Sequence, residues 1–352
     1  MPSTITEFLN FAWFAYFWAK AGVKHSANLE LFPWSQIMVL RRVGVYLFVL
    51  LILVLATLIF GNLASLGEGV RYLGQMRAWD PLAARPVDPD GPFGVCYELV
   101  SLTNVGRRDF VLYRLRDLGL SPILVPIPDD PLPNVLVLFH DRGPYTLFVA
   151  HYDKSRETPT YEGASDNTAA VCVLLAALRD LSDRPPSRPV AFLFPAAEER
   201  GARGAQSFLL WAQAQGREIG EVINLDMIGR GKLATRPEAR PGFYFWLPGF
   251  GQIVYDGRSL ARDDPYVQVD AQLISRLRAV LGDDLVTYRR FAAYGDARVF
   301  REAGLPAASV SCDDMYYLGL VWEREADRVE LLDEGNLSLA RRFVVRYALQ
   351  GP

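Results

Sequence analysis

Carboxylates and one imidazole follow several apolar runs of this chain. The candidate groups are His151 and Asp153, Asp166, Glu198 and Glu199, and Asp226. Three of these groups come shortly after runs that end near residues 150, 194 and 225. Like charges gathered this closely repel one another unless a cation compensates them. We therefore expect these side chains to hold one metal ion or a pair of ions.

Short apolar runs alternate with amphipathic stretches from residue 93 to the end of the chain. Strands are predicted at 147–150, 190–194, 222–227 and 306–311, and helices at 107–119, 167–181, 204–214, 296–303 and 336–349. This alternation indicates an α/β domain whose mostly parallel sheet is flanked by helices on both faces. Ligands of such sheets gather beyond the carboxyl ends of the strands. The candidate groups follow those ends.

Each candidate group also has an ordinary structural explanation when it is considered alone. Asp166 can cap the helix predicted from residue 167. The two glutamates can be solvated near a helix N-terminus, and a single histidine is more often structural than a ligand. Recurrence at one edge of the sheet, in four consecutive units, favours a shared site over separate structural roles.

Four motifs in order strengthen this interpretation. They are HYD (151–153), GASDNTAA (163–170), AEERGARGA (197–205) and NLDMIG (224–229). Together they resemble the signature of the two-zinc exopeptidases of the bacterial leucine aminopeptidase type, a family that includes glutamate carboxypeptidases and glutaminyl cyclases. The resemblance runs from about residue 91 to the C-terminus. It implies a zinc-exopeptidase-like fold and two zinc ions as cofactors.

The resemblance also implies the metal ligands. Asp166 is expected to bridge the two zinc ions, with His151 and Asp226 on one ion and Glu199 on the other. Carboxylates and imidazole are both ordinary zinc ligands.

Two further residues receive roles from the same motifs. Asp153 is expected to hold the ring of His151 and fix its tautomer. Glu198 is expected to be the general base, which takes a proton from a water activated by the ions. Neighbouring glutamates suit this division of labour, because one carboxylate can face the metal while the other faces the water.

The sequence departs from the family pattern at one ligand. The pattern has a histidine four residues before an aspartate that matches Asp327, and this chain has Glu323 there, with no histidine after His151. In one interpretation Glu323 is itself the ligand, since carboxylate oxygen also binds zinc. In the other the second metal position is damaged and the protein holds a single ion. Arg324 could also neutralise Glu323 as an ordinary ion pair.

These alternatives lead to different functions. The first predicts a membrane-anchored aminopeptidase that hydrolyses N-terminal residues of peptides. The second predicts a catalytically inactive homologue, which serves as a structural or binding subunit of a membrane complex. A third possibility is a single-metal acyl transferase similar to the glutaminyl cyclases.

The N-terminal part of the chain is predicted to meet a membrane. Residues 43–66 carry no charge and are long enough for one transmembrane helix, the alternative being a buried core helix. Within residues 1–42, the aromatic segment Phe8–Ala19 is predicted to lie in the lipid interface or to dock on another membrane protein. Residues 67–92 are predicted to be a linker to the domain at 93–352. The double arginine at 41–42 favours a cytoplasmic N-terminus and an extracytoplasmic domain.

The composition excludes some other classes. A chain that is 51% hydrophobic with a net charge of −3 is unlike a disordered protein or a nucleic-acid binder. Its three cysteines, Cys96, Cys172 and Cys312, have no paired spacing, which argues against a zinc ribbon or a dense disulfide framework. The expected partners are a peptide substrate and membrane lipid.

Overall fold

The computed structural model describes residues 34–61, 63–79, 85–236, 243–247, 251–255, 260–262, 271–287 and 295–351. The chain divides into two compact units, Met1–Ala56 and Thr57–Pro352. The predicted segment Phe8–Ala19 lies outside the described residues.

The N-terminal helix α2 (Trp34–Gly61) begins before the predicted span, and a second helix, α3 (Leu63–Arg77), follows it. The prediction marked an uncharged run at 43–66 and a linker from residue 67. The two helices extend beyond that run. An α-helix is held by backbone hydrogen bonds, which charged residues form as well as uncharged ones. Among the residues that the structure describes, none of the helices is both long and apolar enough to cross a membrane.

The second unit is built on an eight-stranded sheet in the order β1-β2-β4-β3-β5-β11-β6-β10. The strands are β1 (Ile123–Val125), β2 (Asn134–Leu138), β3 (Tyr145–Val149), β4 (Val190–Phe194), β5 (Ile219–Leu225), β6 (Leu233–Arg236), β10 (Leu285–Thr287) and β11 (Ala307–Cys312). The central strands β4, β3, β5 and β11 run parallel, whereas β2 and β6 join them antiparallel. A separate sheet contains β7 (Phe243–Leu247), β8 (Gly251–Tyr255) and β9 (Leu260–Arg262).

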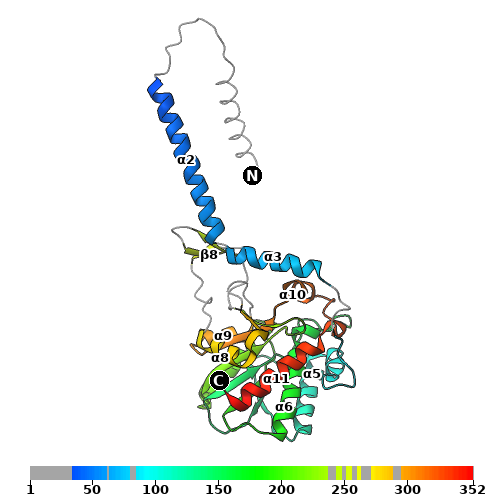
Figure 1. The fold of residues 1–352 in the computed structure, drawn as a ribbon. Helices are drawn as coiled ribbons and strands as arrows, with labels where there is room; N and C mark the ends of the chain where they lie inside the picture. The colour runs from blue at the N-terminus through cyan, green and yellow to red at the C-terminus, as the bar shows by residue number, and fades with distance from the viewer. Residues whose placement is uncertain are drawn as a thin grey trace. The chain divides into compact units, whose positions relative to one another are not determined.

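Helices accompany the sheet (Figure 1). They are α4 (Val95–Val100), α5 (Asn104–Asp117), α6 (Ala169–Asp183), α7 (Arg203–Ala214), α8 (Ala271–Leu281), α9 (Asp296–Glu302), α10 (Met315–Val321) and α11 (Glu334–Gln350). Those at 104–117, 169–183, 203–214, 296–302 and 334–350 match predicted helices, whereas those at 95–100, 271–281 and 315–321 have no predicted counterpart. The predicted α/β fold with a mostly parallel sheet is confirmed.

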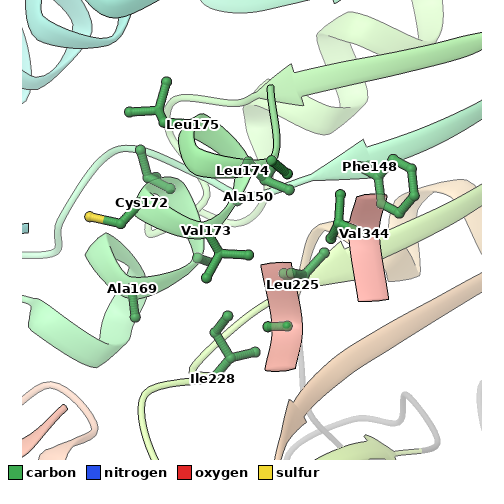
Figure 2. Packing of buried hydrophobic residues seen from close by; sticks show 14 of the residues in the cluster. Phe148, Ala150, Ala169, Cys172, Val173, Leu174, Leu175, Leu225, Ile228 and Val344 are labelled. Carbon is green, nitrogen blue, oxygen red and sulfur yellow. The ribbon is translucent and has the colours of Figure 1, made fainter. Parts of the chain in front are cut away.

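The sheet separates two hydrophobic cores. Along β3, Phe148 packs into one core, and Leu147 and Val149 pack into the other, since alternate side chains of a strand face opposite sides. Figure 2 shows the first core, where Phe148 and Leu225 of the sheet meet α6 and Val344 of α11. In the second core, α7 and α9 contact each other and cover the opposite face.

Cys96 of α4 and Cys172 of α6 form a disulfide inside the first core. No local pattern in the sequence identifies this pair, because 76 residues separate the two cysteines. Both side chains are fully buried, so the disulfide ties α4 to the central helix beneath the site.

Candidate active site

Three parallel strands bring the candidate groups to one edge of the sheet. β3 ends two residues before His151, β4 ends four residues before Glu198, and β5 ends one residue before Asp226. Because β4, β3 and β5 are adjacent and parallel, their carboxyl ends meet. The structure thus gathers groups that lie up to 75 positions apart in the sequence, as the pattern of strand ends predicted.

His151 is fully buried and sits among carboxylates. Its Nε2 atom lies 3.3 Å from Asp166 Oδ1 and 3.8 Å from Asp226 Oδ1. On the other side of the ring, Nδ1 lies 3.1 Å from the carbonyl oxygen of Asp153 and 3.5 Å from its carboxylate. The main-chain oxygen is therefore the nearer partner of the ring, and orientation by the Asp153 carboxylate stays a prediction.

The Asp153 carboxylate has a second contact, which the sequence did not indicate. Its Oδ1 accepts a hydrogen bond of 3.2 Å from the backbone N–H of Glu198. Asp153 thus connects the loop after β3 to the loop after β4, which carries both glutamates.

Three of the predicted ligands are positioned to share a cation. One ligand atom each of His151, Asp166 and Glu199 lies within 4.8 Å of the others. His151 Nε2 and Glu199 Oε1 are buried atoms that lack a hydrogen-bond partner among the described residues. Buried polar atoms without partners are rare. These atoms and the mixed imidazole and carboxylate donors fit a zinc ion.

The electrostatics of the cluster also favour the binding of a cation. Burial, followed by the repulsion of Asp166, raises the pKa of Glu199 to about 9. Burial likewise raises the pKa of Asp166, and that of Glu198 well above its usual range. Burial lowers the pKa of His151, but the carboxylates of Asp153, Asp166 and Asp226 around the ring outweigh it and raise that pKa well above its usual value. A cation bound among these groups would take the place of their protons.

A cleft of about 230 Å³ opens over these residues. Its lining includes Asp166, Glu198, Glu199, Gly201, Asp226, Met227, Trp322 and Glu323. The structure thus brings the candidate base and three candidate ligands to one cavity. Glu323 belongs to the cleft wall just after α10, and its side chain is exposed. It is not in the group of three close ligand atoms, and its role as a ligand stays a prediction.

A tight turn presents Asp166. Gly163 has a φ of +60°, and a Cβ atom there would come within 2.8 Å of the Asp166 carbonyl oxygen, so only glycine fits. Asn167 donates a 2.9 Å hydrogen bond to the Leu225 carbonyl at the end of β5. The alternative that Asp166 caps the next helix is wrong, because α6 has Thr168 at its N-cap and no side-chain cap there.

Asp327 holds this turn from the C-terminal part of the chain. Its carboxylate accepts hydrogen bonds from the backbone N–H groups of Ser165 at 2.7 Å and Asp166 at 3.0 Å. The sequence supplied Asp327 only as a reference point for Glu323. No local signal reveals this contact, because 161 positions separate Asp327 from Asp166.

Arg107 is a second residue that the sequence reasoning missed. It is fully buried, and its guanidinium donates to the Tyr152 carbonyl at 3.0 Å and to the Thr168 hydroxyl. Arg107 therefore joins α5 to the loops that present His151 and Asp166. An arginine on an amphipathic helix usually faces water, so its type gave no indication of this position.

We expect Asp327→Ala to lower the free energy of unfolding by about 2 to 5 kcal/mol, because it leaves two buried N–H groups without an acceptor. Asp327→Asn should also destabilise, since an amide offers one acceptor oxygen in place of two. Urea denaturation measures the effect, with Glu330→Ala, an exposed residue nearby, as the control. Equal stability of both alanine variants would contradict this role of Asp327.

The fold and the site together define the class of the protein. The chain has the α/β fold of zinc-dependent exopeptidases, with a buried imidazole and carboxylate cluster at the carboxyl ends of its central strands. Residues 134–348 match the model of peptidase family M28. The chain belongs to this family, and the resemblance seen in the sequence is confirmed.

Solved structures share this fold at low sequence identity. The LapA aminopeptidase of Legionella pneumophila aligns with a TM-score of 0.59 and 17% identity, covering 74% of this chain and 71% of that one. A glutaminyl cyclase of Bacteroides thetaiotaomicron aligns with a TM-score of 0.56 and 15% identity, covering 76% of this chain and all of the other. At such identities the likeness concerns the fold.

Two curated proteins match parts of the sequence. A vacuolar membrane protease of Kluyveromyces lactis is 35% identical over 107 residues, which are 29% of this chain and 11% of that protein. A probable zinc metalloprotease of Pyrenophora tritici-repentis is 30% identical over 115 residues, which are 31% of this chain and 26% of that protein. The chain thus matches about a tenth and a quarter of the length of these relatives.

Proposed function

We propose that this M28 family protein is a membrane-anchored aminopeptidase with a two-metal site. The observation that carries the proposal is the cluster of His151, Asp166 and Glu199 beside Glu198 on one cleft. The family and its zinc-dependent structural relatives imply a peptide substrate and zinc.

The residues have distinct tasks in this proposal. His151, Asp166, Glu199, Asp226 and Glu323 hold the ions. When bound, zinc lowers the pKa of a water molecule and polarises the scissile carbonyl. Glu198 takes the proton of the attacking water on its carboxylate and returns it to the leaving amine.

Anchoring by α2 is supported by its side chains. All the large hydrophobic residues from Val43 to Leu55 are exposed. Exposed apolar patches of this size are unusual on proteins that face water alone. The curated relative named a vacuolar membrane protease also agrees with a membrane location.

Metal content and peptidase activity test the proposal together. The purified full-length chain is analysed by elemental mass spectrometry and assayed with a panel of aminoacyl chromogenic substrates. Two ions per chain and turnover of at least one substrate support a two-metal aminopeptidase. One ion without turnover supports the alternative of an inactive homologue that acts as a subunit of a membrane complex. Glu323 is exposed, and an exposed carboxylate binds an ion weakly unless the ion holds the side chain in place. This exposure favours the inactive homologue.

Glu323→Ala separates these alternatives. If Glu323 is a ligand, we expect the variant to bind one ion fewer per chain and to lose most of its activity, whereas Glu323→His retains both ions. Glu325→Ala is the matched control, because Glu325 is an exposed glutamate of the same loop. Two bound ions in Glu323→Ala would show that Glu323 is not a ligand. A gain of activity in Glu323→His would show that the natural site is impaired.

Metal should stabilise the protein more strongly at alkaline than at acidic pH. The pKa of Glu199 rises from 4.5 to about 9 in the folded chain without metal, so the folded state binds more protons than the unfolded state between these values. The stability of the chelated protein therefore falls as the pH rises from about 5 towards 9. A metal ion replaces these protons.

Thermal unfolding in zinc and in EDTA measures this difference. We expect the gain in Tm on adding zinc to be larger at pH 8.5 than at pH 5.5, under ionic strength matched with potassium chloride. A gain that is the same at both pH values would contradict the assignment of the cluster as a metal site.

A further inference from the structure

The helix α3 has two different faces, and one of them is docked on the start of α10. Gln75 of α3 donates a 2.8 Å hydrogen bond from Nε2 to the Asp313 carbonyl, and its Oε1 accepts a 2.9 Å bond from the N–H of Met315. The ring of Tyr72 meets Tyr316 at a centroid distance of 5.7 Å. These contacts fix α3 against the start of α10.

Just beyond α3, an aromatic contact continues this docking. The Trp79 ring lies 5.6 Å from the ring of Tyr316 and is stacked 6.1 Å from that of Tyr317. The guanidinium of Arg230 lies 4.2 Å above the same indole. Since Arg230 follows the loop of Asp226, these contacts reach from the α3 segment to the loops of the cleft.

Three apolar side chains of α3 are exposed. Val70 is 70% exposed, Leu73 is 49% exposed and Met76 is 41% exposed. Their spacing of three residues makes them neighbours along the helix. At 100° per residue, Leu73 and Val70 lie about 160° and 140° around the helix from Gln75. The docked face therefore directs Val70 and Leu73 away from α10.

Chain continuity indicates what covers these apolar side chains. α3 begins two residues after α2 ends, and the large hydrophobic side chains of α2 from Val43 to Leu55 are exposed as well. Arg77 of α3 lies about 160° around the helix from Gln75, on the same side as Val70 and Leu73. Helices that lie in a lipid interface combine an apolar face with basic side chains that attract anionic headgroups. The stem of Arg77 can extend along such an interface.

We infer that α3 lies on the surface of an anionic lipid bilayer, with Val70, Leu73 and Met76 in the boundary between headgroups and acyl chains. The inference rests on the proposed anchoring by α2. α10 has seven residues, which is a length of about 10 Å, and Trp322 and Glu323 of the cleft wall follow it directly. The lipid contact of α3 thus places this end of the cleft near the membrane and favours peptides whose N-termini lie at its surface.

A fluorescent label on α3 tests the lipid contact. Full-length Leu73→Cys, in a Cys312→Ser background, is labelled with an environment-sensitive dye and reconstituted in vesicles of phosphatidylcholine and phosphatidylglycerol in a two-to-one ratio. The control is Tyr113→Cys, an exposed position on α5. We expect nitroxide-headgroup lipid to quench the Leu73 label roughly twofold more than the Tyr113 label. Val70→Cys provides a second position if Leu73→Cys fails to fold.

Flotation of the vesicles separates failure of the inference from failure of the anchoring. If the protein floats with the vesicles but both labels are quenched equally, the inference about α3 is overturned and anchoring by α2 stands. Energy transfer between labels on two chains, without quenching by lipid, identifies a second copy as the occupant and also overturns it. If the unlabelled chain does not float, the proposed anchoring fails, and the inference fails with it.

Discussion

Glu198→Gln is expected to lower kcat about 1,000-fold while leaving metal content and KM nearly unchanged. The amide keeps the size of the side chain but cannot accept a proton from water. Glu198 is placed for this task by the loop after β4, where its backbone N–H donates to Asp153, and it lines the cleft with the candidate ligands. Steady-state kinetics on an aminoacyl substrate that the wild type cleaves give kcat and KM separately.

The control for this variant is Glu218→Gln. Glu218 is exposed and immediately precedes β5, so it lies at the end of that strand opposite the cleft. It carries the same chemical change without contact to the cluster. If Glu198→Gln binds metal and retains more than about a tenth of wild-type kcat, Glu198 is not the general base.

Most residues of the candidate site could be predicted from the sequence, because each of them lies close to a feature that the local sequence reveals. His151, Glu198 and Asp226 each follow a strand that is recognisable as a short apolar run. The parallel order of these strands then brings their ends together, and this order follows from the alternation of strands and helices. The prediction needed no knowledge of which strands are neighbours, only that parallel strands share one edge for their carboxyl ends.

The remaining features depend on pairings across long separations. Asp327 reaches the turn of Asp166, and Cys96 reaches Cys172, through the three-dimensional packing of segments whose sequences do not identify each other. The buried position of Arg107 depends on the carbonyl groups of Leu99 in α4, Tyr152 and Gly163, which come from three separate segments of the chain. Such contacts carry no periodicity or spacing, so they become visible only when the fold is known.

The N-terminal helices illustrate a different limit of the sequence analysis. Hydropathy located the apolar run of α2, but the prediction of a linker from residue 67 overlooked α3. Gly67, Gly69 and Gly74 obscured this helix, because glycine is a poor helix former. Its helical state agrees with the ring contacts and the Gln75 hydrogen bonds to α10, because tertiary packing stabilises helices of low intrinsic propensity.

Asp166→Asn should remove most of the metal affinity, and its effect on stability should depend on metal. We expect zinc affinity to fall at least about 100-fold. Mutation of a residue that only contacts a metal ligand already lowers metal affinity by about 10- to 100-fold. Asp141→Asn is the control, because Asp141 is exposed and precedes β3 at the end of the strand away from His151.

Stability measured in zinc and in EDTA distinguishes a role of Asp166 in metal binding from a role in folding. Burial raises the pKa of Asp166, so its charge is unfavourable in the folded chain without metal, and a neutral asparagine should be no less stable than the wild type in EDTA. In zinc the wild type gains stability by mass action, about 4 kcal/mol at a thousand times the Kd, and the variant gains far less. Wild type and variant should therefore have similar Tm values in EDTA and well-separated values in zinc. A variant that is equally destabilised in both would show that Asp166 serves the fold and not the metal.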